Sequence, residues 1–180
     1  MAVTDSTTPY RVCVVCAGNI CRSPIAEFVL RHRLEQAGLG DLVTVDSAGT
    51  GGWHAGQPAD PRAVAALHHH GYDGSAHRAR QFRREWFADV DLVLALDREN
   101  FAGLSTLARD DDTRAKVQLL RSYDPDVMAG DDTDVPDPYY GDDAAFVHVL
   151  LMIERAADGF VAAVRQEIEL DVPGGEPSRQ

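Results

Sequence analysis

The sequence predicts an α/β fold: a single domain built on an open parallel sheet of about four strands, with helices on both faces. Short apolar runs, typical of strands buried on both faces, alternate with longer segments of helical periodicity. The chain has 180 residues, of which 44% are hydrophobic, so it can form a substantial core without disulfides or metal. We place the domain at residues 10–170 and expect the polar ends, 1–9 and 173–180, to be disordered.

Four apolar runs, at residues 11–15, 43–47, 92–96 and 117–120, are the predicted strands. The first two, with the helix expected between them, form a right-handed βαβ unit. Ligands of open α/β sheets bind beyond the carboxyl ends of the strands. Cys16 follows the first strand and is expected at that edge.

The predicted helices are defined by apolar spacing and by capping residues. The first ends at Gly38, and the second begins at Asp60 and Pro61 and ends at Gly71. Asp97 is expected to cap a third helix, and a long helix from about 143 to 170 closes the sheet. The positions expected to face the core are Ala26, Val29, Leu30, Leu34 and Ala37, then Val64 and Leu67, and finally Phe146, Leu150, Ile153, Phe160 and Val164.

An anion-binding loop is predicted where the first strand ends. Residues 12–24 read VCVVCAGNICRSP: a cysteine, five loop residues, an arginine, a serine and a proline near a helix start. If the loop curls, the backbone N–H groups of residues 17–22 converge on one tetrahedral anion, and the positive end of the helix points into the same space. Gly18 and Asn19 are expected to supply the positive φ that the curl needs. The loop residues are Ala17, Gly18, Asn19, Ile20 and Cys21.

Three side chains of this segment suit nucleophilic attack on phosphorus. The helix N-terminus and a nearby cation favour the thiolate of Cys16, the expected nucleophile. Arg22 offers paired planar donors for two phosphoryl oxygens. Ser23 can donate a hydrogen bond to the sulfur and steady the leaving thiolate. The alternative is a buried structural cysteine beside a surface arginine.

The loop resembles the signature of the low-molecular-weight protein tyrosine phosphatases, and a second segment, DPYYG at 137–141, resembles the same family. The resemblance covers roughly residues 10–165. It implies a flavodoxin-like fold and hydrolysis of phosphotyrosine through a phosphocysteine, with neither metal nor cofactor. It also implies that Asp137 is the general acid and base, which protonates the departing phenol. The alternative is a solvated acidic loop, since other aspartates surround Asp137.

The family pattern implies further roles in the site. Ser47 is expected to brace Asn19, although N-capping or turn formation is equally compatible with the sequence. Trp53, Tyr139 and Tyr140 are expected to form the walls of a substrate cleft that admits an aryl phosphate and excludes short phosphoserine. The alternative for these aromatics is plain core packing.

A redox role is expected for Cys21, which lies in the same tight loop as Cys16. Peroxide would oxidise Cys16 to a sulfenic acid, which Cys21 would capture as a disulfide. The alternative is that Cys21 only packs against the loop. The histidines at 68–70 precede a helix end, which favours a capping role over metal binding. The basic segment 77–84 is expected to pair with the abundant carboxylates, and the alternative is a substrate-docking role.

The composition limits the classes of molecule that are expected to bind. The net charge of −12 and the pI near 4.8 argue against nucleic acid or anionic membranes. No secretory signal or membrane span is visible, and three cysteines, two of them in the anion loop, do not suggest a disulfide framework, so a cytoplasmic location is expected. The expected partners are phosphotyrosine-containing proteins, with inorganic phosphate or vanadate as inhibitors.

Other functions share parts of this pattern. Thioredoxin-coupled arsenate reductases need two further cysteines, and none follows Cys21. Protein-arginine phosphatases of the same fold carry threonine where Ile20 stands. A non-catalytic phosphotyrosine-binding module would be expected to lack the nucleophile, the arginine or the acid, and all three types are present. A metal phosphatase is disfavoured because no ligand cluster of recognisable spacing appears.

Overall fold

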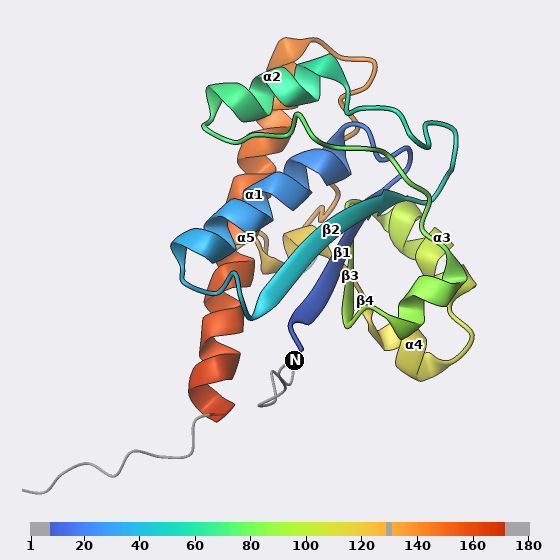
Figure 1. Ribbon diagram of the computed structural model, residues 1–180, viewed down its shortest axis with the longest axis vertical. Coiled ribbons are helices and arrows are strands. Elements are labelled where there is room, and N and C mark those ends of the chain that lie inside the picture. Colours follow the sequence, from blue (N-terminus) through green and yellow to red (C-terminus); the bar gives the residue numbers. More distant parts are fainter. Residues whose placement is uncertain (1–7, 129–130, 172–180) are drawn as a thin grey trace, which may run out of the picture.

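The computed structural model describes residues 8–128 and 131–171. Its four strands are parallel and lie in the order β2-β1-β3-β4 (Figure 1). They are β1 (Tyr10–Cys16), β2 (Val43–Gly49), β3 (Leu92–Ala95) and β4 (Val117–Leu119). The predicted fold class is therefore confirmed. The predicted disordered tails, 1–9 and 173–180, lie outside the described residues except for positions 8 and 9.

Helices cover both faces of the sheet. Helices α1 (Arg22–Gln36) and α5 (Asp143–Asp171) lie on one face with α2 (Pro61–His69) packed against both, and α3 (Arg98–Leu107) and α4 (Asp111–Ala115) lie on the other (Figure 1). Two short 3₁₀ helices, η1 (Arg84–Ala88) and η2 (Leu120–Tyr123), complete the chain order. Among the described residues, no helix combines the length and the apolarity needed to cross a membrane.

The continuous apolar run of β1 is explained by burial on both faces of the sheet. Val12 and Val14 pack into the core beneath α1 and α5, whereas Cys13 and Val15 pack into the core on the α3 side. All four side chains are at most 1% exposed. A central parallel strand shows no polar alternation because neither of its faces meets water.

The helix predictions hold in most places. The α5 positions expected to face the core, Phe146, Leu150, Ile153, Phe160 and Val164, are all fully buried. Asp97 caps α3 as expected, since its Oδ1 accepts the N–H of Asn100 at 2.6 Å. The expectation that Val64 faces the core is wrong. Its side chain is half-buried, because the buried face of α2 is formed by Ala63 and Leu67. Leu120, expected in the fourth strand, begins η2, and α4 was not predicted.

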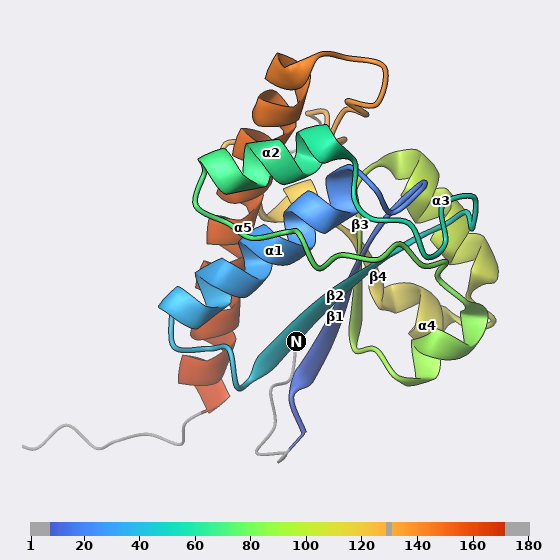
Figure 2. The ribbon, with the colours of Figure 1, turned by 45° about the horizontal axis from the view of Figure 1, so that its top comes forward.

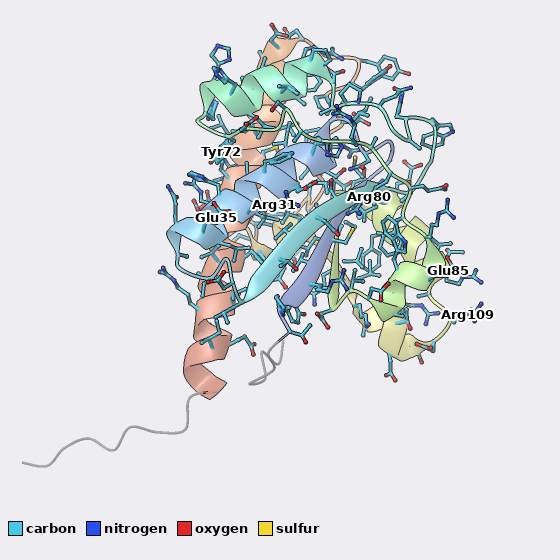
Figure 3. All side chains as sticks on the ribbon, in the orientation of Figure 1. Arg31, Glu35, Tyr72, Arg80, Glu85 and Arg109 are labelled. Atoms are coloured by element: carbon cyan, nitrogen blue, oxygen red, sulfur yellow. The ribbon has the colours of Figure 1, made fainter. Side chains whose placement is uncertain are left out.

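The outer edge of β2 is covered by two arginines. Arg31 of α1 donates from Nε to the Val45 carbonyl at 2.6 Å, and Arg80 donates from Nε to the Ser47 carbonyl at 2.9 Å. Figure 3 shows Arg31 on α1 and Arg80 near the carboxyl end of β2. Exposed strand edges invite pairing with other chains, so these contacts protect the edge and hold the end of β2 that adjoins the site.

Candidate active site

A pocket of about 240 Å³ opens at the carboxyl ends of the strands. Figure 2 shows that the loop after β1, the segment after β2 and the orange segment before α5 lie at this same end of the sheet. The lining residues are Cys16, Ala17, Gly18, Ile20, Cys21, Arg22, Trp53, His54, Asp137, Tyr139 and Tyr140. The structure thus brings the expected nucleophile, arginine, acid and three aromatics together, although they are far apart in the sequence.

The sulfur of Cys16 lies next to a hydroxyl that can donate to it. Cys16 Sγ is 3.0 Å from Ser23 Oγ. Ser23 Oγ accepts from Asn19 Nδ2 at 2.9 Å, so its own proton is free for the sulfur or for the more distant Ala48 carbonyl at 3.3 Å. No side chain caps the N-terminus of α1, at Cys21. Its first N–H groups are therefore available to a bound anion.

Asn19 stabilises the loop through buried hydrogen bonds. It is the one non-glycine residue with a positive φ, 56°, in the described part of the chain, and it is fully buried. Its Nδ2 donates to Ser23 Oγ and Ser47 Oγ, each at 2.9 Å, and its Oδ1 accepts the N–H of Arg80 at 2.9 Å. Its carbonyl oxygen lies 2.8 Å from Nε2 of His77. Ser47 thus stands where the resemblance to the family implied.

The expectation of a positive φ at Gly18 is wrong. Among the described glycines, positive φ occurs at Gly38, Gly56 and Gly71. A Cβ at Gly18 would lie 3.0 Å from His54 Cδ2, so a larger residue there would require the His54 side chain to shift slightly. The left-handed turn of the loop rests on Asn19 alone.

A buried carboxylate lies beneath this network. Glu27 Oε2 accepts the hydroxyl of Ser47 at 2.5 Å and lies 3.7 Å from Nδ1 of His77. Burial raises the pKa of Glu27, but the polar contact with His77, the hydrogen bond from Ser47 and the charge of Arg31 outweigh burial, so the pKa falls below its ordinary value of 4.5. Glu27 is therefore charged at neutral pH and holds Ser47 in the orientation that accepts from Asn19. The sequence did not single out Glu27 or His77.

The basic segment 77–84 follows its expectation in part. Arg80 pairs with Asp46 at 2.7 Å, and Nδ1 of His77 lies 3.7 Å from Glu27. Within residues 8–128 and 131–171, however, Arg78, Arg83 and Arg84 form no ion pair, and Arg78 donates instead to the carbonyl of His77. The segment lies against the end of β2, where the N–H of Gly49 donates to the Arg80 carbonyl at 2.8 Å, so backbone hydrogen bonds as well as ion pairs position it.

Arg22 is buried among acceptors. Its Nη1 donates to Asp97 Oδ2 at 2.5 Å and to the Val135 carbonyl at 2.9 Å, and its Nη2 donates to Asp137 Oδ2 at 3.1 Å. Burial lowers the pKa of Arg22, but Cys16, Asp137 and Asp97 raise it and prevail, so the pKa lies above its ordinary value. Arg22 is thus a fixed, charged donor. Asp97 was predicted only as a helix cap, but it also holds Arg22 in place. Its position just after β3, at the carboxyl end of the sheet, is the signal that could have indicated this role.

Asp137 lies at the mouth of the pocket, with its side chain half-exposed. Its Oδ1 accepts the N–H of Tyr139 at 3.1 Å, while its Oδ2 faces Arg22. The preceding chain is anchored to the sheet by an N–H from Val135 to the Leu96 carbonyl at 2.8 Å. Asp137 is therefore a solvent-accessible carboxyl group next to Arg22, on a loop that is held on its N-terminal side.

The three aromatics surround the pocket mouth and are not core residues. Trp53 is 73% exposed and Tyr140 96% exposed, and the ring of Tyr139 meets that of Tyr140 edge-on, with centroids 5.0 Å apart. The indole of Trp53 lies over Gly51, where an added Cβ would come within 2.1 Å of the ring. This placement excludes the core-packing alternative. His54, which the sequence analysis did not select, completes the wall.

Cys21 is a free, buried thiol beside the nucleophile. Burial, reinforced by the charges of Asp60, Cys16 and Asp137, raises the pKa of Cys21 well above its usual value.

No group of three His, Cys, Asp or Glu side chains is placed to hold a metal ion anywhere in the described ranges. The histidines at 68 and 69 are exposed near the end of α2.

Comparison with known proteins settles the family. The family model described as low molecular weight phosphotyrosine protein phosphatase matches residues 11–170. The chain belongs to this family. It is 59% identical over 160 residues to a protein of Streptomyces coelicolor named low molecular weight protein-tyrosine-phosphatase, and the match covers 89% of this chain and 96% of that protein. The resemblance inferred from the two loops is confirmed.

Solved structures agree with this assignment. A protein tyrosine phosphatase of Entamoeba histolytica, crystallised with Hepes in its active site, superposes with a TM-score of 0.82 at 29% identity, covering 87% of this chain and 97% of the other. Wzb of Vibrio vulnificus, in complex with benzylphosphonate, superposes with a TM-score of 0.73 at 29% identity, covering 87% and 99%. The chain is thus a member of an enzyme family whose named relatives are protein-tyrosine phosphatases.

Proposed function

We propose that the domain at residues 10–170 hydrolyses phosphotyrosine in proteins through a phosphocysteine intermediate, with neither metal ion nor cofactor. One observation carries this proposal: Cys16, Arg22 and Asp137 line one pocket, with the uncapped N-terminus of α1 beside them. A thiolate, a planar cation and a carboxylic acid are the three groups that a cysteine-based phosphomonoester hydrolase needs.

In the first step the Cys16 thiolate attacks phosphorus and the bond from phosphorus to the phenol oxygen breaks. Arg22 holds two phosphoryl oxygens, exchanging its contact with Asp137 for the substrate. Asp137 donates a proton to the departing oxygen. In the second step the Asp137 carboxylate takes a proton from water, which attacks phosphorus, and the phosphorus–sulfur bond breaks. The Ser23 hydroxyl, 3.0 Å from the sulfur, stabilises the leaving thiolate.

The aromatic rim supports a phosphotyrosine substrate. Trp53, Tyr139 and Tyr140 stand at the pocket mouth, where they can flank the ring of an aryl phosphate whose phosphate reaches Cys16. The complex of Vibrio vulnificus Wzb with benzylphosphonate, which joins an aromatic ring to a phosphonate, supports an aryl phosphate as the substrate. A phosphoserine is too short to place its peptide outside such a rim. Inorganic phosphate and vanadate would compete for the same loop.

A reducing compartment such as the cytoplasm fits the chemistry. All three cysteines are free and buried, and a catalytic thiolate must remain reduced. The net charge of −12 supports protein substrates rather than nucleic acid or anionic membranes as partners.

The nucleophile is tested by Cys16→Ser. This variant should lose hydrolysis of an aryl phosphate and still bind inorganic phosphate, because serine is not ionised but the backbone donors remain. Arg22→Lys should be severely impaired, since lysine cannot make the bidentate contact. Turnover and titration calorimetry with phosphate check both variants. Substantial turnover by Cys16→Ser would exclude the cysteine mechanism.

The acid is tested by Asp137→Asn. Turnover should fall by about 10²- to 10⁴-fold for phenyl phosphate, whose leaving group is basic, and much less for p-nitrophenyl phosphate. Asp142→Asn is the matched control, because Asp142 lies in the same segment and accepts the N–H of Ala145 outside the pocket. An equal loss for both substrates in Asp137→Asn would show that Asp137 is not the proton donor.

Redox protection is tested by Cys21→Ser. After peroxide treatment and addition of a thiol reductant, the wild type should recover activity, because Cys21 captures the Cys16 sulfenic acid as a disulfide with loss of water. Intact mass should show the loss of two hydrogens in the oxidised wild type and added oxygen in the variant, which should stay inactive. Identical recovery in both proteins would mean that Cys21 does not protect the nucleophile.

A further inference from the structure

The segment that follows Asp137 is bound by an arginine from another part of the chain. Arg62, on the first turn of α2, donates from Nη1 to the Gly141 carbonyl at 2.8 Å and from Nη2 to the Tyr139 carbonyl at 3.0 Å. Its guanidinium also lies over the ring of Phe146 at 4.5 Å from the centroid. One planar group thus binds two carbonyls of the acid loop, on either side of Tyr140, to α2.

The Arg62 side chain is itself held by Asp60. The guanidinium donates from Nε to Asp60 Oδ1 at 3.0 Å and from Nη2 to Oδ2 at 2.8 Å. The hydrogen bond from Arg62 is the main reason that the pKa of Asp60 lies below its ordinary value. The N–H of Asp60 donates to the carbonyl of Ile20 in the phosphate loop at 2.8 Å. Asp60 and Arg62 therefore join the loop of the nucleophile to the loop of the acid.

The contacts of Arg62 determine the shape of the acid loop. A turn closes between the Gly141 N–H and the Pro138 carbonyl at 2.8 Å, and the Tyr139 N–H donates to Asp137 Oδ1. Arg62 holds the two residues whose N–H groups make these bonds. Upstream, Val135 anchors the chain to the sheet and to Arg22. Among the described residues, the other hydrogen bonds that tie residues 135–141 to the rest of the domain are those of Val135 and the one from Arg22 to Asp137.

We propose that Arg62 is a positioning residue for the general acid, which it keeps in line with the phosphate loop by fixing the carbonyls of Tyr139 and Gly141. This inference rests on the proposed role of Asp137. Arg62 does not line the pocket, so it acts through the loop and not on the substrate. A shift of about 1 Å in a catalytic group can cost about 10²-fold in rate, which makes such a clamp significant.

The test compares Arg62→Met with Arg33→Met in the full chain. Arg33 is the matched control, because its side chain is 28% exposed against 31% for Arg62 and it likewise joins two elements, α1 and α5, through Glu154 and Asp158. Turnover of phenyl phosphate by Arg62→Met should fall about 10-fold or more, with little change for p-nitrophenyl phosphate. In an Asp137→Asn background the substitution should cost nothing further, and phosphate affinity should stay unchanged. Arg33→Met should leave the ratio of the two substrates unchanged.

A second readout does not depend on activity. Amide hydrogen exchange, followed by NMR, should be faster at Tyr139 and Gly141 in Arg62→Met and unchanged there in Arg33→Met. An equal loss for both substrates, additivity with Asp137→Asn, or unchanged exchange at these amides would overturn the proposal. Failure of the proposed acid role would be recognised separately, because Asp137→Asn would then lose the same activity on both substrates. In that case the exchange rates would still show whether Arg62 holds the loop.

Discussion

The conformation of Asn19 is the constraint on which the site depends. A left-handed residue in the middle of the anion loop turns the chain back toward Cys16, and this conformation is unfavourable for most side chains. Asn19 is held in it by buried hydrogen bonds to Ser23 and Ser47 and from the backbone of Arg80. Because the bonded groups come from α1, β2 and the segment after α2, the loop takes its shape only when these elements have packed.

The same network orients the hydroxyl next to Cys16. Ser23 accepts a hydrogen bond from Asn19 and so directs its own proton toward the sulfur or the more distant Ala48 carbonyl. Arg22 forms ion pairs with Asp97 and Asp137. In the proposed mechanism a bound phosphoryl group would take the place of Asp137 on Arg22, whereas Asp97 would stay as the fixed partner. The site thus exchanges one anionic partner for another without leaving a buried cation unpaired.

The sequence was informative where the determinants are local. The strands and α5 follow from apolar runs, and Cys16, Arg22 and Ser23 follow from spacing within one short segment. Contacts between distant segments were not predictable: Glu27 with His77, Asp97 with Arg22, and Arg62 with the acid loop each depend on how the helices pack. Gly18 shows the same limit, since its φ is not positive and its close approach to His54 is not visible in the sequence. Val64 was misplaced because periodicity alone did not fix the rotation of a short helix.

Phosphate binding by Asn19→Gly tests the central claim most directly. Glycine adopts positive φ without strain, so this variant removes the side-chain hydrogen bonds and leaves the backbone free to curl. We predict that its dissociation constant for inorganic phosphate, measured by titration calorimetry, rises about 10-fold or more, as expected for the loss of several buried hydrogen bonds. A dissociation constant equal to that of the wild type would contradict the account, because the loop would then hold its shape without Asn19.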